Sequence, residues 1–275
     1  MPLCGRRDGD VAKTAMPGRR LSMLFVVDIG NTNIVLAIHD GQKWVEHWRI
    51  YSDQKKTSDE YFVVLESLFT HAGLHAVDVD KAVISSVVPN LSRSLQKNTN
   101  RLFDVDPLMV SHDIITGLKR TSIPLELGSD LLCNLAQAHH RYPDRACMVV
   151  DFGTALTFST VDRDGAVLGV AIAPGLITAV NALYGNTAQL PQVELKLPDT
   201  VLGRDSVQSI RAGIMHGYAG MVSSIIEKTE QEIGERLQIV ATGGLSATIA
   251  PLIPRIEEIS PMHTLDGLKL LAELN

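Results

Sequence analysis

The chain has 275 residues, of which 45% are hydrophobic and 20% charged, so it can bury a core in one large domain or two modest ones. Its formal net charge of -6 excludes the broad basic face that nucleic-acid binding requires. No apolar run approaches the roughly 20 residues of a membrane helix, and Cys4, Cys133 and Cys147 are too scattered for a disulfide framework. We therefore expect a cytoplasmic protein with reduced thiols that binds neither nucleic acid nor membrane.

Residues 1–22 differ from the rest of the chain. They carry five basic and two acidic side chains, several glycines and prolines, and no periodic apolar pattern. This composition predicts a disordered N-terminal extension. Because Met23 stands directly before a strand-like run, we interpret residues 1–22 as an extension from an upstream start codon.

The first structured unit is expected to be three antiparallel strands. Strand-forming residues fill 23–28 and are followed by a turn-prone segment at 29–32. A second strand is expected over 33–38 and a third over 43–49, joined by an Asp-Gly hairpin turn at 40–41.

The same unit recurs over residues 146–171. The second copy again has a strand ending in an aspartate, a glycine turn, a strand over 155–161, an Asp-Gly turn and a strand over 166–171. Asp28 and Asp151 are 123 residues apart and the two Asp-Gly turns 124 apart, so one register serves both units to within a residue. The sequence therefore predicts a duplicated domain.

The remaining pattern alternates helices with strands. Helical spacing is found over 58–72, 129–141, 206–234 (one helix or two) and 265–274, and further strands are expected over 81–88, stopped by Pro89, and over 237–241. This is the pattern of the α/β class with two similar halves. We assign an N-terminal domain to residues 23–120 and a C-terminal domain to 121–275.

The two strand-ending aspartates suggest phosphate chemistry. In residues 28–32 and 151–154, the glycine lets backbone N–H groups approach a phosphate, Asn or Thr adds side-chain donors, and the carboxylate suits a metal ion. One such turn is more often only a turn. Two copies at equivalent places of a duplicated unit favour a phosphate site.

Two further segments each leave two interpretations open. Residues 242–244, Thr-Gly-Gly, either form a strand-to-helix turn or give a nucleotide base a bare backbone to pack on. Asp130, at the start of a predicted helix, either accepts backbone N–H bonds as an N-cap or takes the proton of a hydroxyl that attacks a γ-phosphate. The sequence has no P-loop or dinucleotide-binding glycine motif, and its histidines are too scattered for a metal cluster.

Several stretches, in their order and spacing, resemble one family over residues 23–275. They are D-I-G-N-T at 28–32, R-I-Y-S-D-Q-K-K-T-S-D-E-Y at 49–61, S-S-V-V-P-N at 85–90, P-L-E-L-G-S-D at 124–130, D-F-G-T-A at 151–155, A-P-G at 173–175, G-N-T-A-Q-L-P at 185–191 and T-G-G at 242–244. Together they resemble the type III pantothenate kinases of the actin-like ATPase superfamily. The resemblance implies two duplicated ribonuclease H-like domains with mixed sheets, flanked by helices, and an ATP cleft between them.

The resemblance also implies an activity and a set of site residues. The reaction would be ATP-dependent phosphorylation of pantothenate to 4'-phosphopantothenate, the first step of coenzyme A biosynthesis, with Asp130 as general base. Asp28 and Asp151 would hold magnesium and a monovalent cation, potassium or ammonium. ATP would be bound by Asp28, Gly30, Asn31, Thr32, Gly153, Thr154, Gly243 and Gly244. Pantothenate would be bound by Gly128, Ser129, Asp130 and Thr187, with Thr187 reaching the partner's pocket in a homodimer.

The sequence departs from the family at the acceptor side. Leu131 stands where the family has an arginine that binds the pantothenate carboxylate, Thr121 replaces a tyrosine, and Ser159 replaces an aspartate. Candidate replacements for the missing cation are Lys119, Arg120 and Arg204. Two alternatives therefore stay open: a non-catalytic or regulatory nucleotide-binding relative, and a kinase for a different small alcohol.

Overall fold

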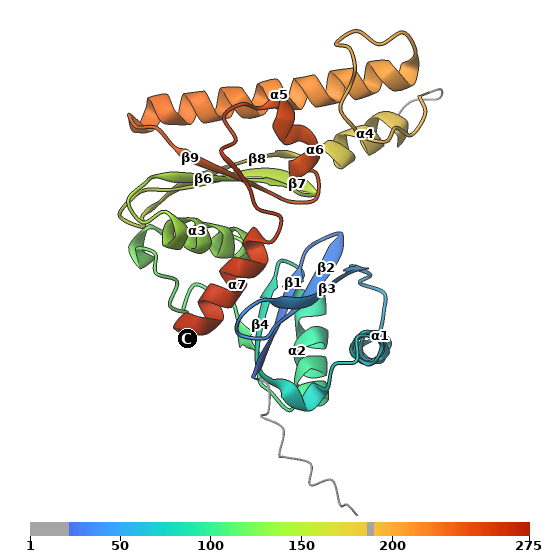
Figure 1. Ribbon diagram of the computed structural model, residues 1–275, viewed down its shortest axis with the longest axis vertical. Helices are drawn as coiled ribbons and strands as arrows, with labels where there is room; N and C mark the ends of the chain where they lie inside the picture. The colour runs from blue at the N-terminus through green and yellow to red at the C-terminus, as the bar shows by residue number, and fades with distance from the viewer. Residues whose placement is uncertain (1–21, 186–189) are drawn as a thin grey trace, which may run out of the picture.

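The computed structural model describes residues 22–185 and 190–275 (Figure 1). The predicted extension at 1–22, apart from Ser22, lies outside the described residues, and so does Thr187. Ser22 donates a hydrogen bond of 2.7 Å to Asp80 Oδ2, just before the first strand.

Two mixed five-stranded sheets form the scaffold. The first has the order β3-β2-β1-β4-β5 and the second β10-β9-β6-β7-β8. The strands of the first sheet are β1 (Met23–Ile29), β2 (Asn33–His39), β3 (Trp44–Tyr51), β4 (Val79–Ser86) and β5 (Leu108–Met109). Those of the second are β6 (Cys147–Phe152), β7 (Ala155–Val161), β8 (Val167–Pro174), β9 (Gln238–Thr242) and β10 (Glu258–Ile259).

The sheets confirm the predicted duplication. In each, three antiparallel strands that follow one another along the chain are extended by two parallel strands, so β1 to β5 correspond to β6 to β10. Asp28 pairs with Val35, and Asp151 pairs with Thr157. The two partners are 122 residues apart although the aspartates are 123 apart, which places the one-residue difference in the turn that follows each aspartate.

Helices cover both outer faces and fill the space between the sheets (Figure 1). The outer helices are α1 (Ser58–His71) and α2 (Pro89–Phe103) on the first sheet, and α5 (Ser206–Ile233) and α6 (Ser246–Ile249) on the second. Between the sheets lie α3 (Ser129–Arg141) and α7 (His263–Leu274). The remaining elements are α4 (Leu176–Gly185), η1 (Ala76–Asp78), η2 (Arg120–Ser122) and η3 (Ala250–Leu252).

Most helix boundaries follow from local chemistry. The segment expected to form one helix or two forms one, α5. It begins where Asp205 accepts a 2.8 Å bond from Gln208 N, and it ends at Gly234, whose φ is 73°. The α2 helix is absent from the elements expected from the sequence. The sequence pattern predicts only the end of a strand at Pro89, but the proline also provides the fixed φ that suits a first helical turn.

The two inner helices, α3 and α7, pack closely against each other at Gly267. A Cβ added to Gly267 of α7 would lie 2.3 Å from the carbonyl oxygen of Cys133 on α3, so only glycine permits this approach. Leu268 and Leu271 of α7 pack with Val26 of β1 in one buried cluster. The last helix of the chain thus lies on the first sheet, although the division at residue 120 assigned it to the other domain. That division itself stays a prediction.

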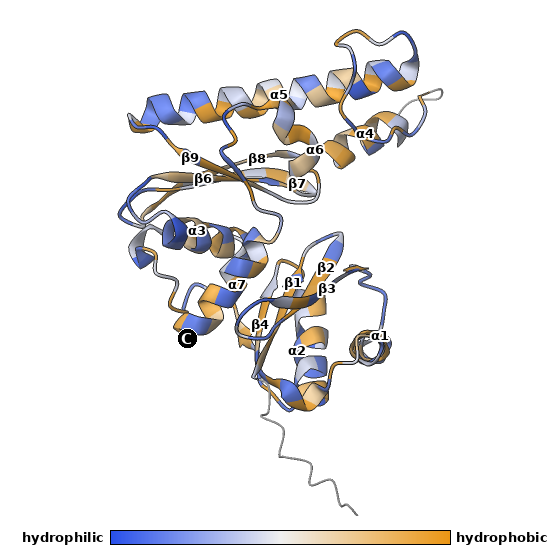
Figure 2. Cartoon of the chain, viewed as in Figure 1, coloured by the Kyte–Doolittle hydropathy of each residue, from blue (hydrophilic) through white to orange (hydrophobic). Residues whose placement is uncertain are grey.

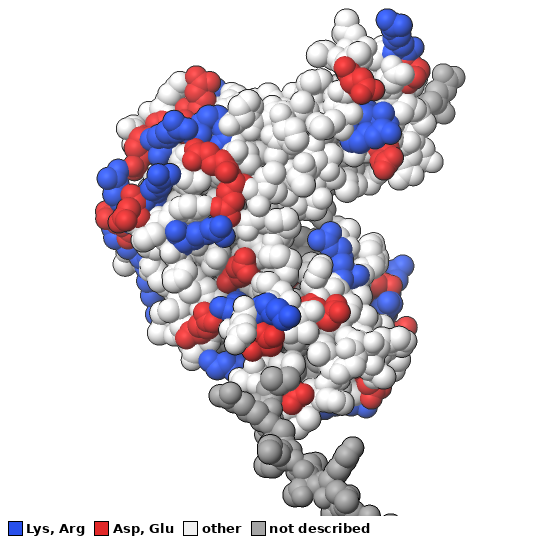
Figure 3. All heavy atoms as spheres, viewed as in Figure 1, with Lys and Arg blue, Asp and Glu red and all other residues white. Residues whose placement is uncertain are grey.

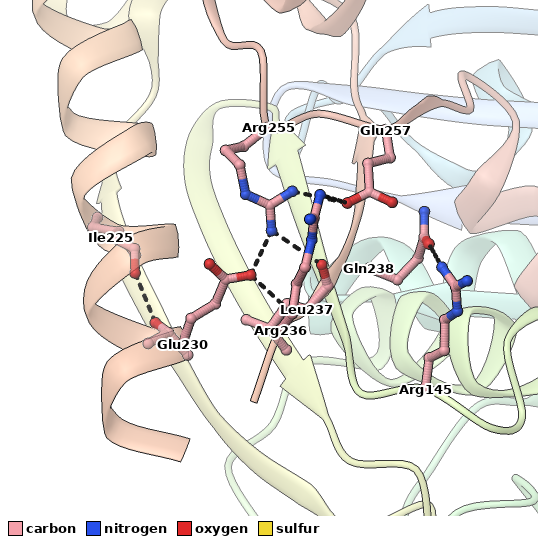
Figure 4. Close-up of polar contacts among 9 residues, drawn as sticks. Arg145, Ile225, Glu230, Arg236, Leu237, Gln238, Arg255 and Glu257 are labelled. Atoms are coloured by element: carbon pink, nitrogen blue, oxygen red, sulfur yellow. Dashed lines mark hydrogen bonds and ion pairs between the residues drawn. The ribbon is translucent and has the colours of Figure 1, made fainter. Parts of the chain in front are cut away.

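The second half also carries a polar network around Arg255 (Figure 4). Arg255 pairs with Glu230 at the end of α5 and, at 2.8 Å, with Glu257. Glu230 Oε1 accepts a 2.8 Å bond from Leu237 N. The network therefore fastens α5 to the start of β9 and to the segment before β10.

Candidate active site

A cavity of about 470 Å³ lies between the two halves, where the surface in Figure 3 is hollowed. The predicted site residues that line it are Asp28, Gly30, Asn31, Thr32, Asp130, Asp151, Gly153, Thr154, Gly243 and Gly244. Gly128 and Ser129 are next to it rather than in its wall, and Thr187 lies outside the described residues. Segments from four distant parts of the sequence thus meet at one place.

The two duplicated turns meet across this cavity. Thr32 Oγ1 and Thr154 Oγ1 are 2.8 Å apart, which joins the turn after β1 to the turn after β6 by a hydrogen bond. Backbone N–H groups and hydroxyls of both turns therefore surround one volume. Such concave sets of donors bind anions.

The second turn is supported from behind by the Ala-Pro-Gly segment. Gly175 N donates to Thr154 O at 3.0 Å, and Thr178 Oγ1 donates to the same oxygen at 2.7 Å. A Cβ on Gly175 would lie 2.2 Å from Gly153 O. In the sequence, only the family resemblance indicates that this segment matters, because no local pattern predicts its contact with a distant turn.

Asp28 lies near the C-terminal end of β1 and lines the floor of the cavity. Burial raises the pKa of Asp28 to about 7, the negative charge of Asp130 adds to the rise, and a hydrogen bond from Ser85 on the neighbouring strand opposes it. Asp151 and Arg49 have smaller effects on this pKa, upward and downward respectively. The carboxylate is therefore short of positive partners.

Asp151 closes β6 at the equivalent place. Burial raises the pKa of Asp151 to about 6, and the charge of Asp130 also raises it. The fully buried Asn134 of α3 donates a long 3.5 Å bond to Asp151 Oδ2, while Asn134 Oδ1 accepts a 2.8 Å bond from Thr264. The Thr264 bond fixes the orientation of the amide, so α3 and α7 together hold this carboxylate.

The turn at residues 242–244 lies directly on Asp151. Gly243 has φ 88°, and a Cβ there would lie 2.4 Å from Asp151 Oδ1. Glycine is therefore required both by the backbone conformation and by the lack of space.

Asp130 lies in the first turn of α3, whose N-cap is Gly128. The interpretation of Asp130 as the N-cap is therefore wrong in register, although its Oδ1 does accept a 2.8 Å bond from Leu131 N. Burial raises the pKa of Asp130. Ser129 Oγ accepts a 2.9 Å bond from Ser86 N, which ties the start of the helix to β4 and holds Asp130 at the cavity.

The structure also shows where Leu131 and the candidate replacement cations lie. Leu131 is buried in the apolar cluster between α3 and the second sheet. Of the three candidate replacement cations, Lys119 pairs with Asp164 at 3.6 Å and Arg120 with Asp113 at 2.7 Å. None of the three, Arg204 included, lines the cavity.

Several residues of the cavity wall were not predicted from the sequence, and among them are His47 and Arg49 of β3. They are two residues apart and so share a face of the strand. The sequence shows which residues of the strand share a face, but which of the two faces lines the cavity depends on the packing of the helices.

The donor set fits a cation that keeps other ligands. Within residues 22–185 and 190–275, no three His, Cys, Asp or Glu side chains are arranged to hold a metal ion. Burial raises the pKa of both Asp28 and Asp151, and the negative charge of Asp151 adds to the rise at Asp28. Two carboxylates with room for phosphate oxygens and water suit Mg²⁺.

The helices of the described segments are all too short or too polar to span a bilayer.

A family model described as type III pantothenate kinase matches residues 24–228. A type III pantothenate kinase of Pelobacter propionicus is 42% identical over 254 residues, which cover 92% of this chain and 100% of that protein. One from Myxococcus xanthus is 39% identical over 250 residues, covering 90% of this chain and 97% of that protein.

Solved structures agree on the fold. MreB 5 of Spiroplasma citri bound to AMPPNP matches with a TM-score of 0.52 at 11% identity, covering 92% of this chain and 96% of that one. The ethanolamine utilization protein EutJ of Carboxydothermus hydrogenoformans matches with a TM-score of 0.51 at 14% identity, covering 92% and 89%. The fold is therefore that of the actin-like ATPases.

Proposed function

The chain belongs to the type III pantothenate kinase family, and from this premise we propose that it transfers the γ-phosphoryl group of ATP to pantothenate. The product is 4'-phosphopantothenate, and the reaction is the first step of coenzyme A biosynthesis. The observation that carries the proposal is the single cavity in which both glycine turns, the turn at 242–244 and Asp130 meet.

The nucleotide binds across the two halves. Backbone and side-chain donors of residues 30–32 and 153–154 surround its phosphates, and the Thr32–Thr154 contact brings the two turns to the same phosphate chain. Gly243 and Gly244 line the adenosine end of the cavity, where their lack of side chains leaves backbone to pack against the base.

Asp130 is the general base. Its carboxylate accepts the proton of the acceptor hydroxyl while the hydroxyl oxygen bonds to the γ-phosphorus and the bond from that phosphorus to the ADP oxygen breaks. The raised pKa of Asp130 makes it a stronger base than an exposed aspartate. The Leu131 N–H bond holds one carboxylate oxygen and leaves the other to face the cavity.

Asp28 and Asp151 hold the cations. Magnesium, when bound, neutralises charge on the phosphate oxygens, and a monovalent cation, potassium or ammonium, accompanies it. Both aspartates are buried and have raised pKa values, which supports this role because a cation restores their charged form.

The protein acts as a homodimer in the cytoplasm, and Thr187 contributes to the partner's acceptor pocket. Large apolar side chains are exposed on one part of the second half, on β8, α4 and the segment that follows, where α4 is largely apolar in Figure 2. They include Ile172, Ile177, Tyr184 and Leu202. A face of this kind is typical of protein interfaces, and the free thiols of Cys133 and Cys147 fit a reducing compartment.

The non-catalytic alternative and the alternative acceptor are not favoured. The relatives of about 40% identity span nearly the whole chain, and the three aspartates lie together in the cavity. Leu131 changes only how the acceptor carboxylate is held. A charged hydrogen bond contributes about 1.5–3 kcal/mol, so its loss is expected to raise the KM for pantothenate about 10- to 150-fold.

ADP release tests the function directly. The full chain is assayed with ATP, magnesium and potassium, with and without pantothenate, and the product is identified by mass spectrometry. Pantothenate-dependent ADP release with a product heavier by one phosphoryl group supports the proposal. ADP release that does not depend on pantothenate, at any concentration up to saturation, would refute it.

A further inference from the structure

Arg49 occupies a distinctive place in the cavity wall. It lies on β3, the edge strand of the first sheet, and pairs with Val35, which in turn pairs with Asp28. Directly paired residues of adjacent strands share a face of the sheet. Asp28, Val35 and Arg49 therefore form a row across three strands, and all three line the cavity.

The guanidinium reaches the opposite half. A Cβ placed on Gly244 would lie 3.4 Å from Arg49 Nη1, which is ordinary contact distance. The side chain thus extends from the first sheet to the turn at 242–244 of the second. It lies between the floor of the cavity at Asp28 and its adenosine end.

The positive charge of Arg49 is unusual among the residues of the cavity wall. Among the described residues that line the cavity, Arg49 is the one lysine or arginine, and it faces three aspartates. It forms no ion pair with a carboxylate within the described part of the chain. An exposed, unpaired guanidinium in a cavity with two anion-binding turns is available to a ligand.

We propose that Arg49 is a clamp for the phosphate chain of the nucleotide, reaching from the first half to the second over the bound triphosphate. This inference rests on the proposed function, because it takes the cavity to be the nucleotide site. The planar guanidinium donates two parallel N–H bonds to phosphate oxygens, which a lysine cannot reproduce. Because Arg49 Nη1 lies 3.4 Å from where a Cβ on Gly244 would stand, a nucleotide bound by the guanidinium links both halves.

The test is calorimetric titration of the full chain with ATP, ADP and adenosine in magnesium buffer. Arg49→Gln is expected to raise the Kd for ATP about 10- to 150-fold, to raise that for ADP less, and to leave that for adenosine unchanged. Arg49→Lys, which keeps the charge without the fork, is expected to lie between wild type and Arg49→Gln. The matched control is Glu46→Gln, an exposed charge removal on the opposite face of β3, which is expected to bind all three ligands like wild type.

Circular dichroism of each variant establishes that it is folded. Equal ATP affinity in wild type and both Arg49 variants would overturn the inference and leave the proposed function intact. It would also be overturned if Arg49→Gln kept its ATP affinity but raised the KM for pantothenate and not for pantothenyl alcohol, since Arg49 would then hold the acceptor carboxylate. Wild type that binds no ATP would overturn the proposed function and this inference with it.

Discussion

The two halves of the molecule share a strand order and an aspartate at the end of the central strand, yet they differ on the third strand. In the first half the row across the strands is Asp28, Val35 and Arg49; in the second it is Asp151, Thr157 and Ile172. Arg49 faces the cavity, whereas Ile172 is 68% exposed. The two halves thus have equivalent glycine turns but differ on the third strand, which carries a charged side chain at this position in the first half and an exposed apolar one in the second.

The halves also hold their aspartates differently. Asp28 receives a hydrogen bond from Ser85 within its own sheet, whereas Asp151 receives one from Asn134 of α3, which a hydroxyl of α7 orients. The first carboxylate is therefore fixed by its sheet and the second by the two inner helices. Movement of α3 or α7 would therefore displace Asp151 more directly than Asp28.

The largest effect is expected at Asp130, which belongs to neither repeat. Asp130→Asn should lower kcat about 10²- to 10⁴-fold, because an amide cannot accept the hydroxyl proton. The Kd for ATP, measured by calorimetry, should be nearly unchanged since both glycine turns remain. A fully active Asp130→Asn variant would show that the proton goes elsewhere.

Replacing each repeat's aspartate sharpens the comparison between them. In ligand-free buffer the pKa values of about 7 for Asp28 and about 6 for Asp151 lie above the ordinary 3.8, so the folded state favours the protonated form. Stability from this source is full below about pH 4 and is lost as the pH rises through these values. At pH 8, Asp28→Asn should raise the unfolding free energy by as much as about 4 kcal/mol and Asp151→Asn by about 3 kcal/mol.

Denaturant unfolding at pH 4 and pH 8 measures both differences. The gain should shrink toward zero at pH 4, and both variants should lose magnesium-dependent ATP binding. A gain in stability that is the same at both pH values would contradict the assigned pKa shifts.

Gly267→Ala tests the contact that joins the halves. The new methyl group would lie 2.3 Å from Cys133 O, and relieving this overlap by separating α3 from α7 should cost about 1–3 kcal/mol of stability. Gly213→Ala on α5 is the control, because a Cβ there meets nothing within 4 Å. Equal unfolding midpoints for the two variants would show that the inner helices can move apart freely.

The smallest effects compare the ion pairs of the two halves. Arg255→Gln breaks the partly buried network of Figure 4 and should destabilise by about 1–3 kcal/mol, since Glu230 and Glu257 lose their partner. Arg101→Gln in the first half removes an exposed pair with Asp59 and should cost at most about 1 kcal/mol. Thermal unfolding at low and high salt measures both, and a larger loss from Arg101→Gln would reverse the expected order.

The sequence pattern correctly predicted those elements that are determined by residues close to one another in the sequence. The strand ending at Asp28, its repeat at Asp151 and the α3 helix with Asp130 were all placed correctly within a residue or two. These features follow from period-two alternation, helical spacing and repetition.

Features that depend on packing were missed. The α2 helix is polar enough that its buried stripe of Leu91, Leu95 and Phe103 is hidden among charged and amide residues. The packing of α7 on the first sheet and the approach of Arg49 to Gly244 each bring together segments that lie far apart in the sequence. Charge alone suggests Lys119, Arg120 and Arg204 as replacements for the missing arginine, but Lys119 and Arg120 pair with exposed carboxylates instead.

Hydrogen–deuterium exchange of the full chain with and without ATP and magnesium tests most directly whether both halves form one nucleotide site. The account predicts slower exchange at residues 30–32, 153–154 and 243–244 together, with no slowing on α1. Protection confined to one half, or absent from residues 243–244, would contradict a nucleotide bound between the two repeats.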